Sequence, residues 1–291
     1  MNQDTKPQTL TVIGAGTMGH GIAQVAASAG LRVTLVDADA GALERGRRKI
    51  DENLAGGLAR GKLTEADRDR TVANLATATS VADGARGADL VIEAVVEKLE
   101  VKQALFAELE RIAPAHAILA SNTSSLPLTR IAAALTDPSR LIGMHFFNPV
   151  FLMKLLELVV HPRTSDRARE TALQVARRMG KTAIVVKDSP GFASSRLGVI
   201  LGLEAMRMVE QGVASPADID TAMELGYNHP MGPLKLTDLV GLDVRLAIAD
   251  TLAREIGGDQ YRAPQLLRDK VARGELGKKS GKGFYDWSGK A

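Results

Sequence analysis

The sequence predicts an α/β fold, namely a doubly wound, Rossmann-type sheet with a helical insertion, followed by a smaller all-α C-terminal domain. Short apolar runs alternate with helical patterns through the first two thirds of the chain, which is typical of a parallel sheet. A glycine-rich turn joins the first run to the first helical pattern. After Asp188-Ser189-Pro190-Gly191 the pattern becomes helical, with no strong strand signal. We therefore expect two domains, residues 1–189 and 190–291, separated at this Pro-Gly step.

The clearest local signal lies near the start of the chain. Residues 10–13 form a short run rich in β-branched residues, which predicts a strand. Gly14-Ala15-Gly16-Thr17-Met18-Gly19 follows directly. Apolar residues then recur at helical spacing until Gly30, a natural helix end. Residues 33–36 predict a second strand, which ends in Asp37.

The rest of the first domain continues the alternation. Residues 39–75 read as helical, with breaks at Gly56-Gly57 and Gly61, and Thr64 with Asp67 is a plausible helix start. A charged helix is expected up to about residue 112, and another at 164–179. Further strands are expected at residues 90–96, 118–120, 141–147, 154–160 and 183–187.

Composition excludes several classes of function. The chain of 291 residues is 45% hydrophobic, enough to bury a full core. A net charge of +3 and 3% aromatic residues argue against nucleic-acid binding. No apolar run is long enough to span a bilayer, and residues 1–8 lack the apolar centre of a signal peptide, so a cytoplasmic location is expected. The lack of cysteine excludes disulfides, thiolate catalysis and Cys-ligated zinc, and no metal site is expected.

The glycine turn predicts a dinucleotide-binding site. The first glycine permits the tight turn, the second lets the backbone approach a pyrophosphate, and the third lets helix and strand pack closely. Asp37 stands where an acid accepts hydrogen bonds from the adenosine ribose and repels a 2′-phosphate, which favours NAD over NADP. A purely structural turn and an ordinary strand-end acid remain alternatives. The expected cofactor contacts here are Gly14, Gly16, Thr17, Met18, Gly19 and Asp37.

Two polar residues near strand ends indicate acid–base chemistry. His145 lies in His-Phe-Phe-Asn-Pro, and Glu157 follows twelve residues later in the next predicted strand. Ligands bind outside the carboxyl ends of strands in open α/β sheets, so the two side chains could meet there. Alcohol oxidation needs a base, and a carboxylate on the far nitrogen would orient a histidine for that work. A structural histidine and a lysine-paired glutamate are equally consistent with the spacing.

Several motifs, in order along nearly the whole chain, give the sequence a specific resemblance. They are residues 14–19, Ser121-Asn122-Thr123-Ser124-Ser125, residues 145–149, residues 153–157, residues 188–192, His229-Pro230-Met231-Gly232-Pro233 and residues 277–285. Together they resemble the short-chain L-3-hydroxyacyl-CoA dehydrogenase family, bacterial 3-hydroxybutyryl-CoA dehydrogenases above all. The resemblance implies an NAD-dependent enzyme of fatty acid metabolism that interconverts (S)-3-hydroxyacyl-CoA and 3-ketoacyl-CoA.

The resemblance also implies roles for single residues. The catalytic histidine falls on His145, its partner on Glu157, and the serine that holds the substrate oxygen and thioester region on Ser124. Further cofactor contacts fall on Glu97, Lys102, Asn148 and Lys279. Glu97 and Lys102 could instead form a solvated helix start, and Lys279 could be a plain surface charge.

One position departs from the family pattern. The family usually reads Gly-Phe-x-x-Asn-Arg after the domain junction, with the asparagine near the substrate. This chain reads Gly191-Phe192-Ala193-Ser194-Ser195-Arg196, so Ser195 stands where asparagine is expected. We expect Ser195 to keep a weakened form of that role.

Coenzyme A and a second subunit are the implied partners. The helical insertion is rich in arginine and lysine, which suits the phosphates of coenzyme A, although such runs are usually solvated helix faces. The resemblance points here to Asn53 and Arg60. It also implies a homodimer formed through the apolar helical rows of the C-terminal domain.

The sequence is also consistent with other functions. Another CoA ester, such as 3-hydroxyadipyl-CoA, or a free hydroxy acid could be the substrate. A catalytically silent NAD-binding protein is the third possibility, and the intact His145 and Glu157 argue against it.

Overall fold

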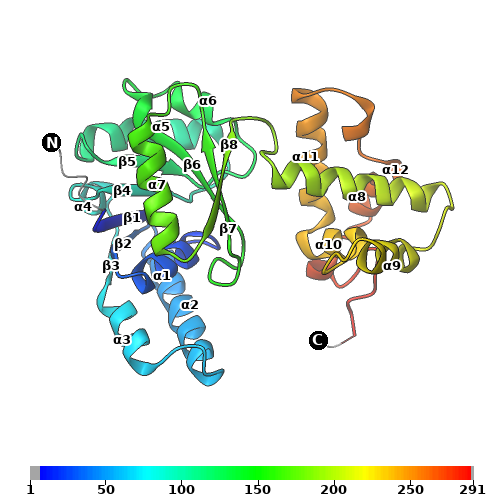
Figure 1. Ribbon diagram of the computed structural model, residues 1–291, viewed down its shortest axis with the longest axis horizontal. Helices are drawn as coiled ribbons and strands as arrows, with labels where there is room; N and C mark the ends of the chain where they lie inside the picture. Colours follow the sequence, from blue (N-terminus) through cyan, green and yellow to red (C-terminus); the bar gives the residue numbers. More distant parts are fainter. Residues whose placement is uncertain (1–6, 290–291) are drawn as a thin grey trace. The chain divides into compact units, whose positions relative to one another are not determined.

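The computed structural model describes residues 7–289, and the chain divides into two compact units, Met1–Asp188 and Ser189–Ala291 (Figure 1). Most of the N-terminal segment 1–8 lies outside the described residues. Within them, no helix combines the length and the apolar character needed to cross a membrane.

The first unit is built on one eight-stranded sheet in the order β3-β2-β1-β4-β5-β6-β7-β8. The strands β1 to β6 all run parallel to one another. β7 runs antiparallel to β6, and β8 is parallel to β7. The strands are β1 Thr9–Ile13, β2 Arg32–Val36, β3 Leu75–Ala78, β4 Leu90–Glu93, β5 Ile118–Ser121, β6 Leu141–Phe146, β7 Leu155–Val160 and β8 Thr182–Lys187. The predicted Rossmann-type fold is confirmed.

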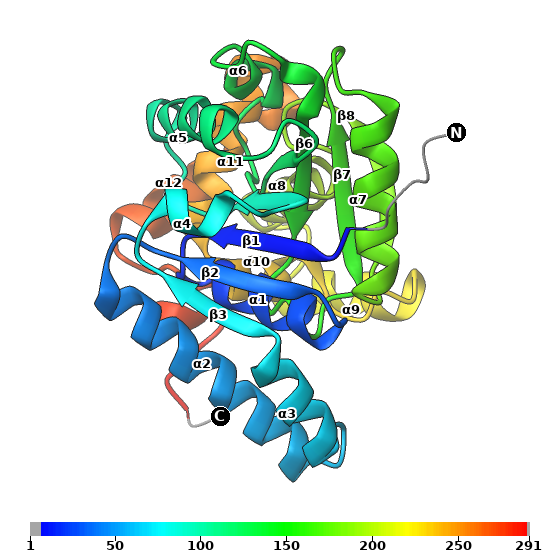
Figure 2. The same cartoon turned by 90° about the vertical axis from the view of Figure 1, so that its left-hand side faces the viewer.

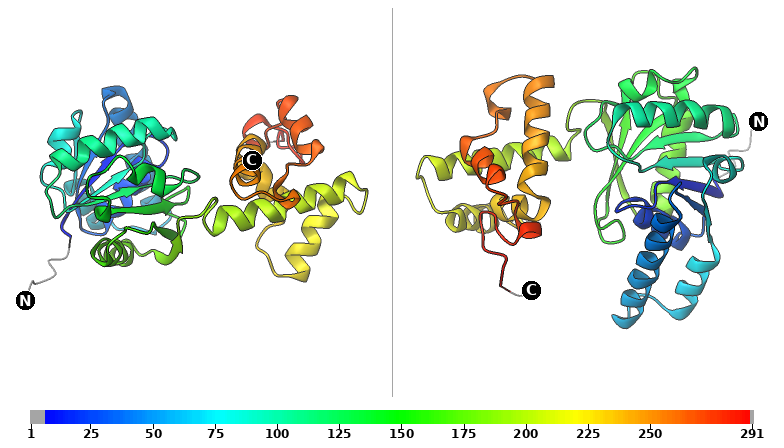
Figure 3. Two further views of the ribbon diagram at one scale, coloured as in Figure 1. Left: turned by 90° about the horizontal axis from the view of Figure 1, so that it is seen from above. Right: turned by 180° about the vertical axis from the view of Figure 1, so that it is seen from behind.

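Helices lie on both faces of this sheet (Figure 3). The strands are therefore short, nearly continuous apolar runs, and every residue of β4 and β6 is buried. Helix α7 packs on β6, β7 and β8, while α1 packs on β1 and β2. The helices are α1 Gly19–Ser28, α2 Ala40–Ala59, α3 Glu65–Ala73, α4 Val81–Ala85, α5 Leu99–Ile112, α6 Leu128–Ala132 and α7 Asp166–Arg178.

The helical insertion forms an arm of α2 and α3 that continues past the strands (Figure 2). Its start is set by Asp39, whose side chain caps α2, and Thr64 forms the predicted capping box with Asp67 at α3. The break predicted at Gly56-Gly57 is wrong, because α2 runs on to Ala59. A Cβ at Gly57 would lie 2.7 Å from the side chain of Leu63, so this glycine allows close packing inside a continuous helix.

Three further details differ from the sequence-based expectations. The strand expected at 90–96 ends at Glu93, and β3, which was not predicted, begins at Leu75, the last residue of the segment expected to be helical. Helices α4 and α6 were not predicted. β3 pairs with β2 at the sheet edge, so partner strand hydrogen bonds stabilise a segment whose own sequence is weakly apolar.

The second unit is helical, as predicted, and its core contains Leu203, Met206 and Leu252. Its helices are α8 Ser194–Glu210, α9 Pro216–Gly226, α10 Pro233–Val240, α11 Leu242–Glu255 and α12 Gln265–Ala272. The buried carboxylate of Asp238 accepts hydrogen bonds from the Phe284 and Tyr285 backbone N–H groups, both at 2.9 Å. The Trp287 indole N–H also donates to it, at 2.8 Å, so one carboxylate holds the tail of the chain.

Candidate active site

The glycine turn between β1 and α1 combines two packing glycines with one open position. Gly14 has φ +101°, and a Cβ there would lie 2.6 Å from the carbonyl oxygen of Ala94. A Cβ at Gly19 would lie 1.7 Å from the carbonyl oxygen of Gly14. Gly16 is exposed, and apart from its chain neighbours no atom lies within 4 Å of its ideal Cβ, so one side of the turn at the start of α1 is open. Thr17 is exposed, and Met18 is the N-cap residue of α1.

The acid after β2 is tied to this turn. The Asp37 carboxylate accepts hydrogen bonds from the backbone N–H groups of Ala15 at 2.9 Å and Asp39 at 3.0 Å. One oxygen therefore contacts the glycine turn and the other contacts the loop that begins α2. This arrangement puts a negative charge beside the turn, at the end of the second strand.

The predicted histidine and glutamate are in contact. His145 in β6 lies opposite Glu157 in β7, and its Nδ1 is 2.7 Å from Glu157 Oε2. Glu157 is fully buried and His145 is 6% exposed. An ionised carboxylate only accepts hydrogen bonds, so a neutral His145 that pairs with ionised Glu157 donates from Nδ1 and keeps its lone pair on Nε2. The Phe147 ring packs against the imidazole, with the ring centroids 4.5 Å apart.

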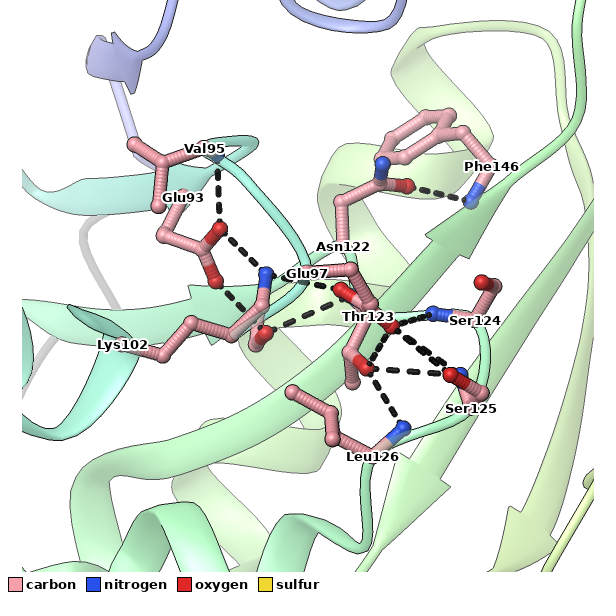
Figure 4. Close-up of polar contacts among 11 residues, drawn as sticks. Glu93, Val95, Glu97, Lys102, Asn122, Thr123, Ser124, Ser125, Leu126 and Phe146 are labelled. Atoms are coloured by element: carbon pink, nitrogen blue, oxygen red, sulfur yellow. Dashed lines mark hydrogen bonds and ion pairs between the residues drawn. The ribbon is translucent and has the colours of Figure 1, made fainter. Parts of the chain in front are cut away.

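The serine-rich loop after β5 lies next to this pair in the sheet. The Asn122 side-chain oxygen accepts a hydrogen bond from the backbone N–H of Phe146 at 2.9 Å, directly after His145 (Figure 4). This bond continues the contact between β5 and β6 beyond the last paired residues, Ser121 and Gly143. Ser124, two residues further on, is exposed.

Glu97 and Lys102 belong to one ionic cluster at the same edge. The Lys102 side chain is 1% exposed, so the alternative of a solvated helix start is wrong for this residue. Its ammonium lies 3.1 Å from Glu97, which in turn accepts hydrogen bonds from the loop of Ser124. Burial alone would raise the pKa of Glu97, but the Lys102 ammonium and the donors of Thr123 and Ser124 hold that pKa below its ordinary value.

The loop between β6 and β7 presents Asn148. Asn148 is exposed, two residues after the end of β6. Lys181 fixes this loop, because its buried ammonium donates hydrogen bonds to the carbonyl oxygens of Val150 and Met153. Loss of solvation on burial lowers the pKa of Lys181.

The remaining predicted residues lie elsewhere in the fold. Asn53 on α2 donates a hydrogen bond to Gln24 at 3.0 Å, and Arg60 follows the end of α2 with an exposed side chain. Lys279 lies in the second unit, where its ammonium is 2.6 Å from Asp243. Ser195 is half-buried in the first turn of α8.

Comparison with known proteins identifies the family. Residues 9–189 match the model of the 3-hydroxyacyl-CoA dehydrogenase NAD-binding domain, and residues 191–287 match that of the C-terminal domain. The chain belongs to the 3-hydroxyacyl-CoA dehydrogenase family. It is therefore an NAD-dependent oxidoreductase, which confirms the predicted family, enzyme class and cofactor.

Individual relatives of this dehydrogenase family match over almost their whole length. A probable 3-hydroxybutyryl-CoA dehydrogenase of Bacillus subtilis is 47% identical, over 97% of this chain and 98% of the relative. Human mitochondrial hydroxyacyl-coenzyme A dehydrogenase is 43% identical, over 96% of this chain and 90% of the relative. The crystal structure of (S)-3-hydroxybutyryl-CoA dehydrogenase from Ralstonia eutropha has a TM-score of 0.93 at 40% identity, covering 97% of this chain and 99% of that one.

One member of the ionic cluster of this dehydrogenase was missed in the sequence. Glu93 ends β4, is fully buried, and lies 2.5 Å from the Lys102 ammonium. Glu93 lies within the apolar run 90–96, which the sequence predicts as one continuous strand. The available signal was the acid itself, since a carboxylate in a buried strand needs a buried donor or cation.

Ser195 gives a direct test of the departure from the family pattern. A serine hydroxyl can donate to a substrate oxygen, although it is shorter than the amide of asparagine and needs a closer approach or a bridging water. We expect Ser195→Ala to cost about 1–3 kcal/mol in kcat/KM, as for an unpaired polar group, and Ser195→Asn to keep activity. If Ser195 only packs in α8, the alanine variant keeps full kcat/KM and the asparagine variant loses it.

Proposed function

We propose that the chain oxidises the 3-hydroxyl group of (S)-3-hydroxybutyryl-CoA, with His145 as the general base. The observation that carries this proposal is the buried contact of 2.7 Å between His145 Nδ1 and Glu157. The pair lies near the carboxyl ends of the parallel strands, where ligands bind in open α/β sheets. A base there can take the hydroxyl proton while C3 of the substrate loses its hydride.

Each residue of the site then has a defined task. His145 Nε2 takes the proton from the 3-hydroxyl group, and the Glu157 carboxylate stabilises the resulting imidazolium. Bound NAD supplies the acceptor for the hydride that leaves C3. The Ser124 hydroxyl donates a hydrogen bond to the substrate oxygen, which becomes the carbonyl of 3-ketobutyryl-CoA. In the reverse direction the imidazolium returns its proton to that oxygen.

The proposed NAD site combines exposed backbone at the glycine turn with the charged side chains of Asp37 and Glu97. The glycine turn, Thr17 and Met18 hold the pyrophosphate, and Asp37 accepts from the adenosine ribose. Asn148 and the exposed part of Glu97, whose side chain is 34% exposed, contact the nicotinamide half. Lys102 is enclosed by two carboxylates, so it contributes there through Glu97.

The remaining assignments concern coenzyme A and the second subunit. Asn53 and Arg60 on the helical arm bind coenzyme A, and Lys279 assists the cofactor. The second unit serves as a substrate and dimerisation domain, and the enzyme is a cytoplasmic homodimer. Exposed apolar side chains on α8, α10 and α11 support a partner surface: Leu197, Leu201, Leu236, Leu239, Val240 and Val244.

One assay tests the proposed substrate. NADH oxidation is followed against 3-ketoacyl-CoAs that differ in chain length and in end group, with the free keto acids alongside. The highest kcat/KM is expected with acetoacetyl-CoA, the keto form of 3-hydroxybutyryl-CoA. A preference for 3-ketoadipyl-CoA, or activity that survives removal of coenzyme A, would replace this substrate with a dicarboxylic ester or a free hydroxy acid. A lack of turnover with every compound would indicate a silent NAD-binding protein.

The Asp37 charge predicts the choice of cofactor. The wild type should prefer NAD strongly over NADP, because the carboxylate repels a 2′-phosphate, and Asp37→Ala should narrow that gap. Asp37→Asn is the matched variant, since it keeps an acceptor for the Ala15 N–H but removes the charge. The measurement is kcat/KM with each cofactor, and similar values for the wild type would contradict the prediction.

A further inference from the structure

The buried end of β4 carries a carboxylate for which the mechanism above has no task. Glu93 pairs in register with Ile13, the residue before the glycine turn, and it is fully buried. Its carboxylate accepts hydrogen bonds from the Val95 backbone N–H at 2.8 Å and from the Ser121 hydroxyl at 2.7 Å. The Lys102 ammonium donates to it at 2.5 Å. The hydrogen bonds of this side chain therefore lie at the carboxyl ends of β4 and β5, beside the glycine turn.

Lys102 connects this carboxylate to a second one. Its ammonium lies between Glu93 and Glu97, at 2.5 Å and 3.1 Å respectively. A buried ammonium needs nearby negative charge and hydrogen-bond acceptors, and the two carboxylates supply both. Glu93 therefore holds Lys102 at the position from which it pairs with Glu97.

Glu97 in turn organises the loop that follows β5. One carboxylate oxygen of Glu97 accepts from the Thr123 hydroxyl at 2.5 Å and from the backbone N–H groups of Ser124 at 2.9 Å and Ser125 at 3.1 Å. The Thr123 hydroxyl also accepts from the Leu126 N–H at 3.0 Å. Figure 4 shows these bonds converging on the turn that carries Ser124.

We infer that Glu93 is a positioning residue for Ser124, and that it acts through Lys102 and Glu97 on the conformation of residues 123–126. The inference depends on the proposed function, in which the Ser124 hydroxyl contacts the substrate oxygen. Without the Glu93 charge, Lys102 keeps one carboxylate partner, and Ser121 and Val95 donate to a weaker acceptor. The Ser124 hydroxyl is then held less firmly where the reaction needs it.

A double-mutant cycle tests this inference. Glu93→Gln is expected to lower kcat/KM for acetoacetyl-CoA by roughly tenfold or more, the loss typical of a hydrogen bond to a charged group. In the background of Ser124→Ala, the same substitution should lower kcat/KM clearly less, because the part of its effect that passes through the Ser124 hydroxyl is already absent. Equal losses in both backgrounds would overturn the inference and assign Glu93 a general structural role.

Two further variants keep the test informative if Glu93→Gln fails to fold. Thr123→Val keeps the side-chain shape but removes the hydroxyl between Glu97 and Leu126, so it should reproduce the loss and its dependence on Ser124. A fully active Thr123→Val would contradict the inference. Glu110→Gln is the control, because Glu110 also accepts from two backbone N–H groups, those of Thr136 and Asp137, and should leave kcat/KM unchanged.

Comparison of Ser124→Ala with and without Glu93→Gln separates this inference from the proposed function. A loss of activity in Ser124→Ala, followed by a further equal loss on adding Glu93→Gln, refutes only the positioning role. Full activity in Ser124→Ala refutes the proposed contact of Ser124 with the substrate, and the positioning role is lost with it.

Discussion

Replacement of His145 by glutamine is expected to lower kcat by about 10²–10⁴-fold, the usual contribution of general acid–base catalysis. Glutamine keeps polarity and approximate size but cannot accept the hydroxyl proton. The affinity for NADH should remain unchanged, because the glycine turn proposed to hold the pyrophosphate lies between β1 and α1, whereas His145 lies on β6. The two measurements are steady-state reduction of acetoacetyl-CoA and a fluorescence titration with NADH.

His116→Gln provides the matched control for this prediction. His116 lies in the same unit, but its side chain is 65% exposed and pairs with Asp89 at 3.2 Å. Its replacement should leave kcat unchanged. If His145→Gln retains kcat to within a factor of a few, another residue is the base.

Replacement of Glu157 by glutamine is expected to lower kcat severely as well, by about 10²-fold or more, because the orienting acid of such a pair contributes on this scale. Glutamine preserves shape, so the loss reports the missing negative charge beside the imidazolium. Because the carboxylate stabilises the imidazolium formed during the reaction, its removal should also change the pH profile of kcat. The pH dependence of kcat is the decisive measurement.

Thermal unfolding separates the chemical from the structural contribution of Glu157. Its carboxylate is fully buried, so a modest fall in Tm is expected for Glu157→Gln. The control Glu170→Gln makes the same change at an exposed position of α7 and should alter neither Tm nor kcat. Unchanged kcat and pH dependence in Glu157→Gln would make this residue structural only.

The sequence predicts best where the signal is local. The glycine turn needs its residue types at fixed positions, since a side chain at Gly14 or Gly19 would meet backbone atoms of the fold. The start of α3 is equally local, because Thr64 and Asp67 satisfy each other's backbone. Both features were predicted from a few neighbouring residues, and the structure confirms them.

Prediction fails where tertiary contacts outweigh local preference. The β3 sequence, Leu-Ala-Thr-Ala, is short and weakly apolar, and its place beside β2 makes it a strand. Gly56-Gly57 is a helix breaker by propensity, but burial of Ile50 and Leu54 on α2 stabilises the helix through it. Neither outcome could be read from the residues of the segment alone.

In the candidate site, too, local motifs identify single residues, whereas the contacts between these residues depend on the tertiary structure. Motifs located His145 and Glu157, but the contact between them depends on the reversal of β7, which an apolar run does not reveal. The short connection was the usable signal, since parallel neighbours need a crossover of about a dozen residues or more. Glu93 was missed because its role appears only when Lys102, nine residues later, folds back onto it.

The antiparallel pairing of β7 with β6 also limits where insertions and deletions can occur in this enzyme. His145 faces Glu157 through the pairing of β6 with β7, and side chains along a strand alternate between the two faces of the sheet. A single-residue slip in the pairing of the two strands would bring Leu156 or Leu158 opposite His145 and turn the carboxylate to the other face. We therefore expect changes of length between His145 and Glu157 to preserve the pair only when they fall in the loop 147–154.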